Sequence, residues 1–252
     1  MLSVVLAKIS ASIPSSLKYP LAPLMPLYAR LLSLGEPIID VPSKAGQFRW
    51  RIDELTCQRI ILGTYEPYMQ KAFVRYVRKG ATVFDVGAHA GYHTALCSLL
   101  VGEFGKVVSF EPHPKNIASL KSQIEVNRFR NVTVSSFALS DRCGVAQLDT
   151  SSGNSQGHVS QAGDFSICLR TMDELVRNEG FASPDLVKID VEGHESEVLR
   201  GAQQTLVEFK PVVLCDYNDD RSFSEVRDIL QPLGYSVSPG PPIIGIHGDQ
   251  LN

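Results

Sequence analysis

Thr82-Val83-Phe84-Asp85-Val86-Gly87-Ala88-His89-Ala90-Gly91-Tyr92 is the stretch that decides the fold. It begins with a short apolar run, which predicts a buried strand, and its two glycines predict a tight turn before a helix that starts near Tyr92. Glycine lets the backbone approach a ligand closely, and the first turn of a helix offers unpaired N–H groups at the positive end of its dipole. The stretch therefore predicts a strand, a turn and a helix that hold a nucleotide-like ligand.

The same alternation of apolar strands and amphipathic helices continues along the chain. Strands separated by helices pair in parallel through right-handed crossovers, with helices on both faces of the sheet. Such sheets bind ligands outside the carboxyl ends of their strands. Acids or glycines occupy five of these predicted ends, at Asp85–Gly87, Glu111, Leu139–Asp141, Asp190 and Asp216. We therefore predict an α/β fold with a doubly wound, mostly parallel sheet.

The residues before this sheet predict an N-terminal hairpin and an arm. Residues 47–52 alternate apolar and charged side chains, as in a half-buried strand, and residues 60–63 are its predicted hairpin partner. We predict that residues 1–45 form a Pro- and Leu-rich arm and that residues 46–252 form the main domain. The arm has no apolar run of roughly 20 residues, the length that spans a bilayer. It is expected to pack on the main domain, with a membrane-surface anchor as the alternative.

Composition narrows the class of partner and the compartment. The formal net charge of −3 offers no basic field for a polyanion, so nucleic acid is not an expected partner. The five cysteines are scattered singly, which predicts neither a zinc site nor a closed disulfide framework. We therefore expect a reducing, cytoplasmic location. The alternative is a cytoplasmic protein that the arm attaches to the membrane surface.

The residues around the glycine turn select among nucleotide ligands. Gly87 and Gly91 lack the close-set glycine pair of the GxGxxG dinucleotide turn. Asp85 would repel a diphosphate but would pair with a cationic amino-acid group, although it could instead cap the turn. Glu111 lies 24 residues after Gly87, where an acid accepts hydrogen bonds from a ribose diol. Together the two acids predict S-adenosylmethionine.

Residues from about Gly63 to Tyr217 resemble the FkbM-type S-adenosylmethionine-dependent methyltransferases. The resemblance rests on the segments GTYEP, VFDVGAHAGYHTAL, FEPHP, FALSD, TMDEL and DLVKIDVEGHESEVLRGA, in their order and approximate spacing. It implies a class I methyltransferase fold, which is Rossmann-like, and O-methylation of a hydroxyl on a sugar, glycolipid or polyketide-like natural product. Asp216 departs from the glutamate that is more usual at its position, and the arm lies outside the resemblance.

Individual site residues follow from the turn and from the resemblance. The predicted cofactor-binding residues are Glu66, Asp85, Gly87, His89, Gly91, Glu111, Pro112, Ser140 and Asp141, with Ser140 or Asp141 near the adenine. The predicted reaction side consists of Lys188, Asp190, Glu192 and His194. Asp190 or His194 would act as general base, while Lys188 would lower the pKa of the acceptor hydroxyl or fix Asp190. The polar residues 150–164 are a candidate lid or acceptor-binding loop.

Several of these assignments have alternatives. His89 and His113 could be ordinary turn or helix-start residues, and Glu192 could be present for the dipole of the helix that follows it. Asp190, Glu192 and Asp216 would suit a divalent cation, but clustered acids alone are a weak signal and no metal is predicted.

The expected partner is a small-molecule, glycan or lipid acceptor, with membrane-surface contact through the arm as an option and no prediction of oligomeric state. Two other functional classes share parts of the pattern. An NAD-dependent oxidoreductase of Rossmann type would share the sheet and Glu111, but the chain lacks the GxGxxG turn. A non-catalytic subunit with a cofactor-binding fold would not need the cluster from Lys188 to Glu195.

Overall fold

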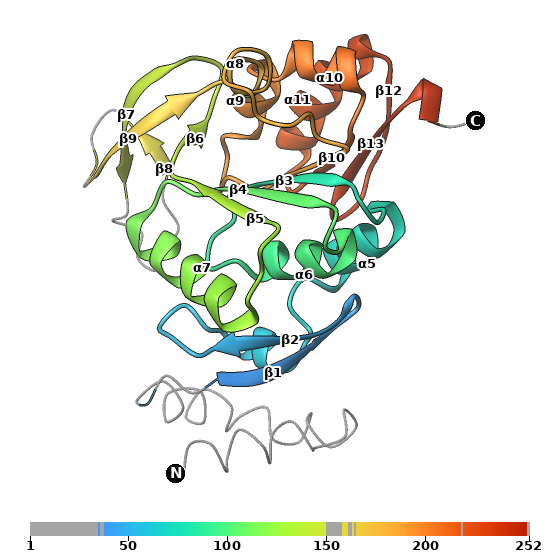
Figure 1. Cartoon of the computed structure of the whole chain (residues 1–252). Coiled ribbons are helices and arrows are strands. Elements are labelled where there is room, and N and C mark those ends of the chain that lie inside the picture. Colours follow the sequence, from blue (N-terminus) through green and yellow to red (C-terminus); the bar gives the residue numbers. More distant parts are fainter. Residues whose placement is uncertain are drawn as a thin grey trace.

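A computed structural model describes residues 35, 38–149, 158–160, 163, 165–217 and 219–250. Its centre is a seven-stranded sheet (Figure 1) with the spatial order β12 (Tyr235–Ser238), β13 (Ile243–His247), β11 (Val212–Cys215), β10 (Leu186–Ile189), β3 (Thr82–Val86), β4 (Lys106–Phe110) and β5 (Val132–Ser135). The five strands from β11 to β5 are parallel, and β13 is antiparallel to both of its neighbours. The predicted doubly wound, mostly parallel sheet is confirmed.

Helices cover both faces of this sheet (Figure 1). One face carries α5 (Pro67–Tyr76), α6 (Tyr92–Val101) and α7 (Pro114–Asn127), and the other carries α8 (Met172–Arg177), α9 (Glu195–Arg200), α10 (Gln203–Phe209) and α11 (Asp220–Leu230). A hydrophobic core fills each interface. The middle strand β10 is buried along its whole length, which explains its nearly continuous apolar sequence. The remaining short elements are α4 (Gln58–Ile61), η2 (Gln231–Leu233) and η3 (Gly248–Gln250).

Several helix boundaries test the sequence reasoning. Thr171 caps α8 by accepting a hydrogen bond from the N–H of Glu174 at 3.1 Å, as its spacing predicts. Pro67 lies in the first turn of α5, also as predicted. Ser222 and Glu225 have the spacing of a capping box, which predicts Ser222 as the cap of α11, but Asp219 occupies that position and accepts from the N–H of Ser222. The apolar pattern over 195–207 predicts one helix, but the structure has two, α9 and α10, which are separated at Gly201 and Ala202.

An antiparallel hairpin precedes the sheet, but its strands are not the predicted pair. Strand β2 (Gly46–Arg51) pairs with β1 (Ile38–Ser43), whereas Ile60 and Ile61 belong to the short helix α4. A brief apolar run does not distinguish a strand from a buried helical turn, which is why residues 60–63 were assigned wrongly. The predicted boundary at residue 45 falls in the turn of this hairpin, and residues 1–34 of the predicted arm lie outside the described residues.

Side chains from α7 complete the free edge of β2. Gln123 donates to the carbonyl of Arg51 at 2.9 Å and accepts from its N–H at 2.8 Å. Asn127 makes the same pair of bonds with Arg49, at 2.6 and 2.7 Å. Gln123 and Asn127 are four residues apart and therefore lie on one face of α7. Arg49 and Arg51 are two residues apart and therefore point their backbone groups to the same edge of β2, so each side-chain amide pairs with one of them. The hairpin is thereby fixed to α7.

A second, four-stranded sheet follows β5 in the chain. Its spatial order is β6 (Ala138–Leu139), β9 (Phe165–Arg170), β7 (Gly144–Asp149) and β8 (His158–Ser160). The sequence predicts one strand over 132–139 that leads to the end at Leu139–Asp141, but the structure has two strands there, β5 and β6, which belong to different sheets. Residues 158–160 of the predicted polar loop form β8, and most of the other residues of that loop lie outside the described part. Within the residues that the structure describes, no helix has the length and apolar character needed to cross a membrane.

Candidate active site

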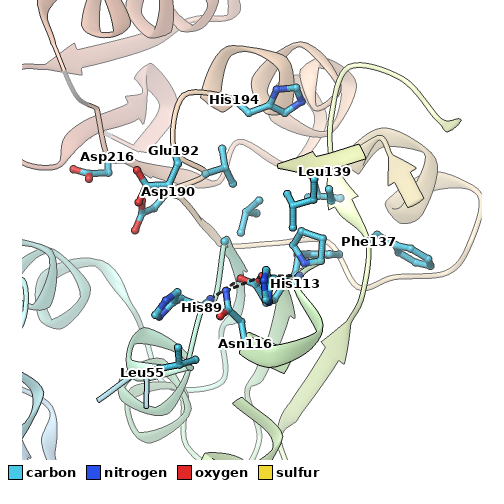
Figure 2. Close-up of a pocket in the computed structure, with 18 of the residues that line it drawn as sticks. Leu55, His89, His113, Asn116, Phe137, Leu139, Asp190, Glu192, His194 and Asp216 are labelled. Carbon is cyan, nitrogen blue, oxygen red and sulfur yellow. Dashed lines mark hydrogen bonds between the residues drawn. The ribbon is translucent and has the colours of Figure 1, made fainter. Parts of the chain in front are cut away.

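A cavity of about 580 Å³ lies at the carboxyl ends of the central strands (Figure 2). This volume is within the range of small-molecule sites, roughly 300–1,000 Å³. Eight of the predicted site residues line it, namely Glu66, Gly87, His89, Glu111, Pro112, Asp190, Glu192 and His194. The other five, Asp85, Gly91, Ser140, Asp141 and Lys188, are not among its lining residues. The predicted residues therefore locate the cavity, but these five were expected to contact a ligand and are not part of the cavity wall.

Glu111 is the most tightly held carboxylate of the cavity. Its Oε2 accepts from the N–H of His89 at 2.8 Å, and its Oε1 accepts from the N–H of His113 at 2.9 Å and from Asn116 Nδ2 at 3.2 Å. Figure 2 shows these groups converging from the glycine turn and from the start of α7. Burial raises the pKa of Glu111, and the N–H donors of His113 and His89 oppose that rise. The network fixes an acceptor group where β4 ends.

The glycine turn is shaped by close contacts within the protein. Gly87 has φ +77°, and a Cβ at this position would lie 1.8 Å from the carbonyl oxygen of Asp190. Gly91 has φ +91° and caps α6, where a Cβ would lie 2.5 Å from Leu120. Only glycine adopts such backbone angles without strain. These glycines are therefore required by β10 and α7, in addition to any ligand that reaches Gly87.

A buried ion pair lies behind the turn. Asp85 and Lys188 are register neighbours on β3 and β10, and their charged groups are 3.1 Å apart. Both side chains are buried, with 0% and 1% exposure. Lys188 also donates to the carbonyl of Gly87 at 2.6 Å and lies 3.6 Å from the carboxylate of Asp190. Lys188 thus links the turn to the end of β10 from behind the cavity.

The pKa shifts of this pair show which charges are stabilised. Burial by itself raises the pKa of Asp85, but Lys188, His93 and the hydroxyl of Thr94 outweigh burial and lower it. Burial by itself lowers the pKa of Lys188, but Asp85, Asp190 and Glu66 outweigh burial and raise it. Both shifts favour the charged forms. The cation that Asp85 was predicted to meet is therefore Lys188 in this structure.

Carboxylates form one side of the cavity. Glu66, Asp190, Glu192 and Asp216 all line it, and Figure 2 shows the last three together, away from His113 and Phe137. Burial raises the pKa of Asp216 to about 6, and the neighbouring charges of Asp190 and Glu66 add to the rise. Among the described residues, no lysine or arginine lines the cavity. The described part of the chain also holds no group of three or more His, Cys, Asp or Glu side chains that could bind a metal ion.

His194 lies apart from these acids (Figure 2) and has partners at both ring nitrogens. Its Nε2 is 3.0 Å from the hydroxyl of Ser140, and its Nδ1 is 3.6 Å from the carboxylate of Glu197. Burial lowers the pKa of His194, so the neutral ring is the favoured form at neutral pH. Ser140 is completely buried and meets the cavity only through this histidine.

Backbone strain is concentrated around the cavity. Glu66, His89 and Glu192 have φ of 39°, 50° and 54°, and all three line it. Glu66 also precedes a proline, a position that ordinarily favours extended backbone. The two other left-handed residues that are not glycine in the described part, Arg128 and Lys210, are ordinary helix C-caps. Left-handed backbone at such residues costs roughly 1–3 kcal/mol and is typical of functional sites.

Sequence reasoning missed the apolar part of the wall. Leu55, Cys57 and Ile60 reach the cavity from the segment that follows the hairpin. The second sheet and the residue before it contribute Phe137, Ala138, Leu139 and Leu148. No local motif marks Leu55, Cys57, Ile60 or Leu148. Phe137, Ala138 and Leu139 belong to the FALSD segment, from which only Ser140 and Asp141 were predicted as site residues. Asp216 is different, because the sequence already indicates it as the acid at a predicted strand end, and it lines the cavity directly after β11.

The chain is similar to several proteins that are named as methyltransferases. The chain is 28% identical over 159 residues to a hexuronic acid methyltransferase of Haloferax volcanii, covering 62% of this chain and 61% of that protein. It is 26% identical over 195 residues to a 2-O-methyltransferase of Sinorhizobium fredii, covering 67% of this chain and 77% of that protein. A crystal structure of a methyltransferase FkbM from Methylobacillus flagellatus is similar with a TM-score of 0.49 and 16% identity, covering 77% of this chain and 56% of that one.

The chain also matches the model of a protein family. Residues 85–237 match the methyltransferase FkbM domain, from the aspartate of the glycine turn to strand β12. The match includes Glu111, Asp190 and Asp216 and covers more than half of the chain. The sheet order, with β13 antiparallel between β11 and β12, is the class I methyltransferase arrangement that this family implies. The chain belongs to the methyltransferase FkbM domain family.

Proposed function

We propose that the protein transfers a methyl group from S-adenosylmethionine to a hydroxyl group of a neutral sugar. The observation that carries the proposal is the division of the cavity into two sides. One side holds the fixed carboxylate of Glu111 among apolar residues, and the other holds a group of carboxylates with no described lysine or arginine in the wall. Family membership supports the reaction type.

The residues of the first side fit the donor. Glu111 is an acceptor-only group when ionised, as binding of a ribose diol requires, and its N–H donors fix its orientation. Phe137, Ala138 and Leu139 offer an apolar surface for a purine ring. The carboxylates of Asp190 and Glu66 suit the ammonium and sulfonium charges. When bound, the donor supplies an electrophilic methyl group on a positively charged sulfur.

The acceptor is inferred from the relatives and from charge. One relative is named for a hexuronic acid and the other for 2-O-methylation, so a sugar hydroxyl is the acceptor that we propose here. Glu66, Asp190, Glu192 and Asp216 place several negative charges along one side of the cavity. A like charge brought close to such a wall is disfavoured unless a cation offsets it. We therefore propose a neutral sugar, although the Haloferax relative is named for an acidic one.

Calorimetric titration tests the donor, and a matched pair of glycosides tests the acceptor. S-adenosylmethionine and S-adenosylhomocysteine are expected to bind, and NAD is not. Transfer of a labelled methyl group is then measured with the p-nitrophenyl glycosides of glucose, galactose and rhamnose, with p-nitrophenyl glucuronide as the anionic control. Labelling of a neutral glycoside above the glucuronide is the expected result. Tight NAD binding without a response to the other two ligands would overturn the reaction type, and preference for the glucuronide would overturn the acceptor class.

A further inference from the structure

Methyl transfer to a hydroxyl releases one proton, so the cavity needs a group that accepts it. His194 and Asp190, the two candidates from the sequence, both have other partners. His194 contacts Ser140 and Glu197 through its two ring nitrogens and lies apart from the acids (Figure 2). Asp190 lies 3.6 Å from the buried ammonium group of Lys188, so its carboxylate already has a cationic partner. Neither side chain is well placed for this step.

Asp216 lies in the same wall. It follows β11 directly, and its N–H donates to the carbonyl of Ile189 at 2.8 Å, so it is held beside the end of β10. Its side chain lines the cavity next to Asp190 and Glu192 (Figure 2). It makes no ion pair with any described lysine or arginine, and its hydrogen-bond donor is the backbone N–H of Tyr217. The residue is therefore held through its backbone, and it lines the cavity without an ion pair to any described lysine or arginine.

The surroundings of Asp216 also raise its affinity for a proton. The charged groups that act on it are Asp190, which follows β10, Lys188 on β10 and Glu66 at the start of α5, and Glu192 also lies beside it (Figure 2). Burial is the main reason that the pKa of Asp216 rises to about 6, with Asp190 and then Glu66 adding to the rise and Lys188 opposing it. A base is most effective when its pKa is near the working pH while it is still mostly ionised. Asp216 meets both conditions at pH 7.

We propose that Asp216 is the general base that accepts the proton of the acceptor hydroxyl during methyl transfer. This inference rests on the proposed function. The hydroxyl oxygen forms a bond to the methyl carbon, the bond between that carbon and the donor sulfur breaks with its electron pair moving to sulfur, and the hydroxyl proton passes to the carboxylate of Asp216. The protonated carboxyl then releases its proton to solvent. Charge and atoms balance without a metal ion or a further reactant.

The test compares Asp216→Asn, Asp216→Glu and Asp190→Asn with the unmodified protein, using the best neutral glycoside of the series above. Asp228→Asn is the matched control, because that carboxylate is exposed on α11, where its partner is Arg227. Donor affinity is measured by calorimetry, and kcat is measured with labelled donor from pH 5 to pH 9. We expect D216N to bind S-adenosylmethionine within about threefold of the unmodified protein while kcat falls roughly 10²–10⁴-fold.

The pH profile separates a base from a structural residue. In the unmodified protein, kcat is expected to rise tenfold per pH unit below a midpoint near 6 and then to level off, as the pKa of Asp216 requires. D190N should keep this limb with a lower midpoint, because the charge of Asp190 contributes to the raised pKa of Asp216. D216N should lose this limb, and D216E should retain it with a shifted midpoint. A D216N protein that keeps the limb, or whose kcat falls less than threefold, would overturn the proposal.

Two further outcomes distinguish this proposal from the proposed function. Loss of S-adenosylmethionine binding in D216N, with normal binding in D216E, would make Asp216 a donor ligand and would overturn its role as base. Failure of the unmodified protein to methylate any neutral glycoside would overturn the proposed function, and the inference about Asp216 with it.

Discussion

Replacing Lys188 by methionine should destabilise the fold mainly through the charge that it leaves on Asp85. The two groups are 3.1 Å apart with 1% and 0% exposure, so Lys188→Met leaves an uncompensated carboxylate in the core. Breaking a buried pair from one side typically costs about 3–5 kcal/mol. The variant also loses the 2.6 Å hydrogen bond from Lys188 to Gly87, which places the total near the upper end of that range.

A double variant of Lys188 and Asp85 measures the interaction energy between the two residues. Asp85→Asn in the Lys188→Met background removes the uncompensated charge and still accepts the hydrogen bond from Thr94. The free energy of unfolding of the double variant should therefore fall by roughly 2–3 kcal/mol less than the sum of the two single changes. Urea unfolding followed by fluorescence of Trp50, the only tryptophan of the chain and a fully buried one, measures all four proteins. Additivity within about 0.5 kcal/mol would refute the argument.

The pH dependence of stability gives an independent check on the charge that Lys188→Met leaves on Asp85. In the unmodified protein the pKa of Asp85 is lowered and that of Lys188 is raised, so the stability that they contribute persists between about pH 4 and pH 10. Without Lys188, burial should raise the folded-state pKa of Asp85 above its unfolded value. The native state then binds more protons than the unfolded state, and stability falls as the pH rises. Lys188→Met should therefore be closest to the unmodified protein at low pH, in the same urea experiment.

Four other changes test single features of the fold and the site. Glu111→Gln should weaken S-adenosylmethionine binding about 10- to 100-fold in calorimetry, through loss of a charged acceptor. Gly87→Ala should unfold at a much lower temperature, because its Cβ would lie 1.8 Å from the carbonyl of Asp190. Asn127→Ala should lose about 1–2 kcal/mol of stability through its bonds to β2. Asp216→Asn should have a higher melting temperature than the unmodified protein at pH 7.5 but the same melting temperature below about pH 4. The pKa of Asp216 is raised to about 6, so ionisation of this carboxylate destabilises the folded protein as the pH rises. Equal melting temperatures at pH 7.5 would contradict the last expectation.

The sequence predicted the central sheet well because its signals are local. Strands β3, β4, β10 and β11 are short, mainly apolar runs that are directly followed by a glycine or an acid, at the predicted ends Gly87, Glu111, Asp190 and Asp216. The predicted hairpin partner of β2 failed because pairing is a tertiary property, and Ile60 and Ile61 gave a local signal that suits either a strand or a helix.

The wall of the cavity was predictable where a residue follows a strand and unpredictable where it depends on packing depth. Glu111 and Asp190 follow strands and line the cavity, as expected. Asp85 and Lys188 were expected to meet ligands, yet they are buried against each other, because register on adjacent strands brings them together. Leu148, an apolar residue of the second sheet, carries no local signal and is recognised as part of the wall only when that sheet is placed.

The bonds between α7 and the hairpin determine how the chain can be shortened. A protein that began at residue 46 would keep β2 and its bonds to Gln123 and Asn127, but it would lose β1 from the other side of that strand. The exposed backbone groups of β2 would then be open to strands of other molecules, a common origin of aggregation. Truncated forms for expression should therefore start before Ile38, although the family match begins only at Asp85.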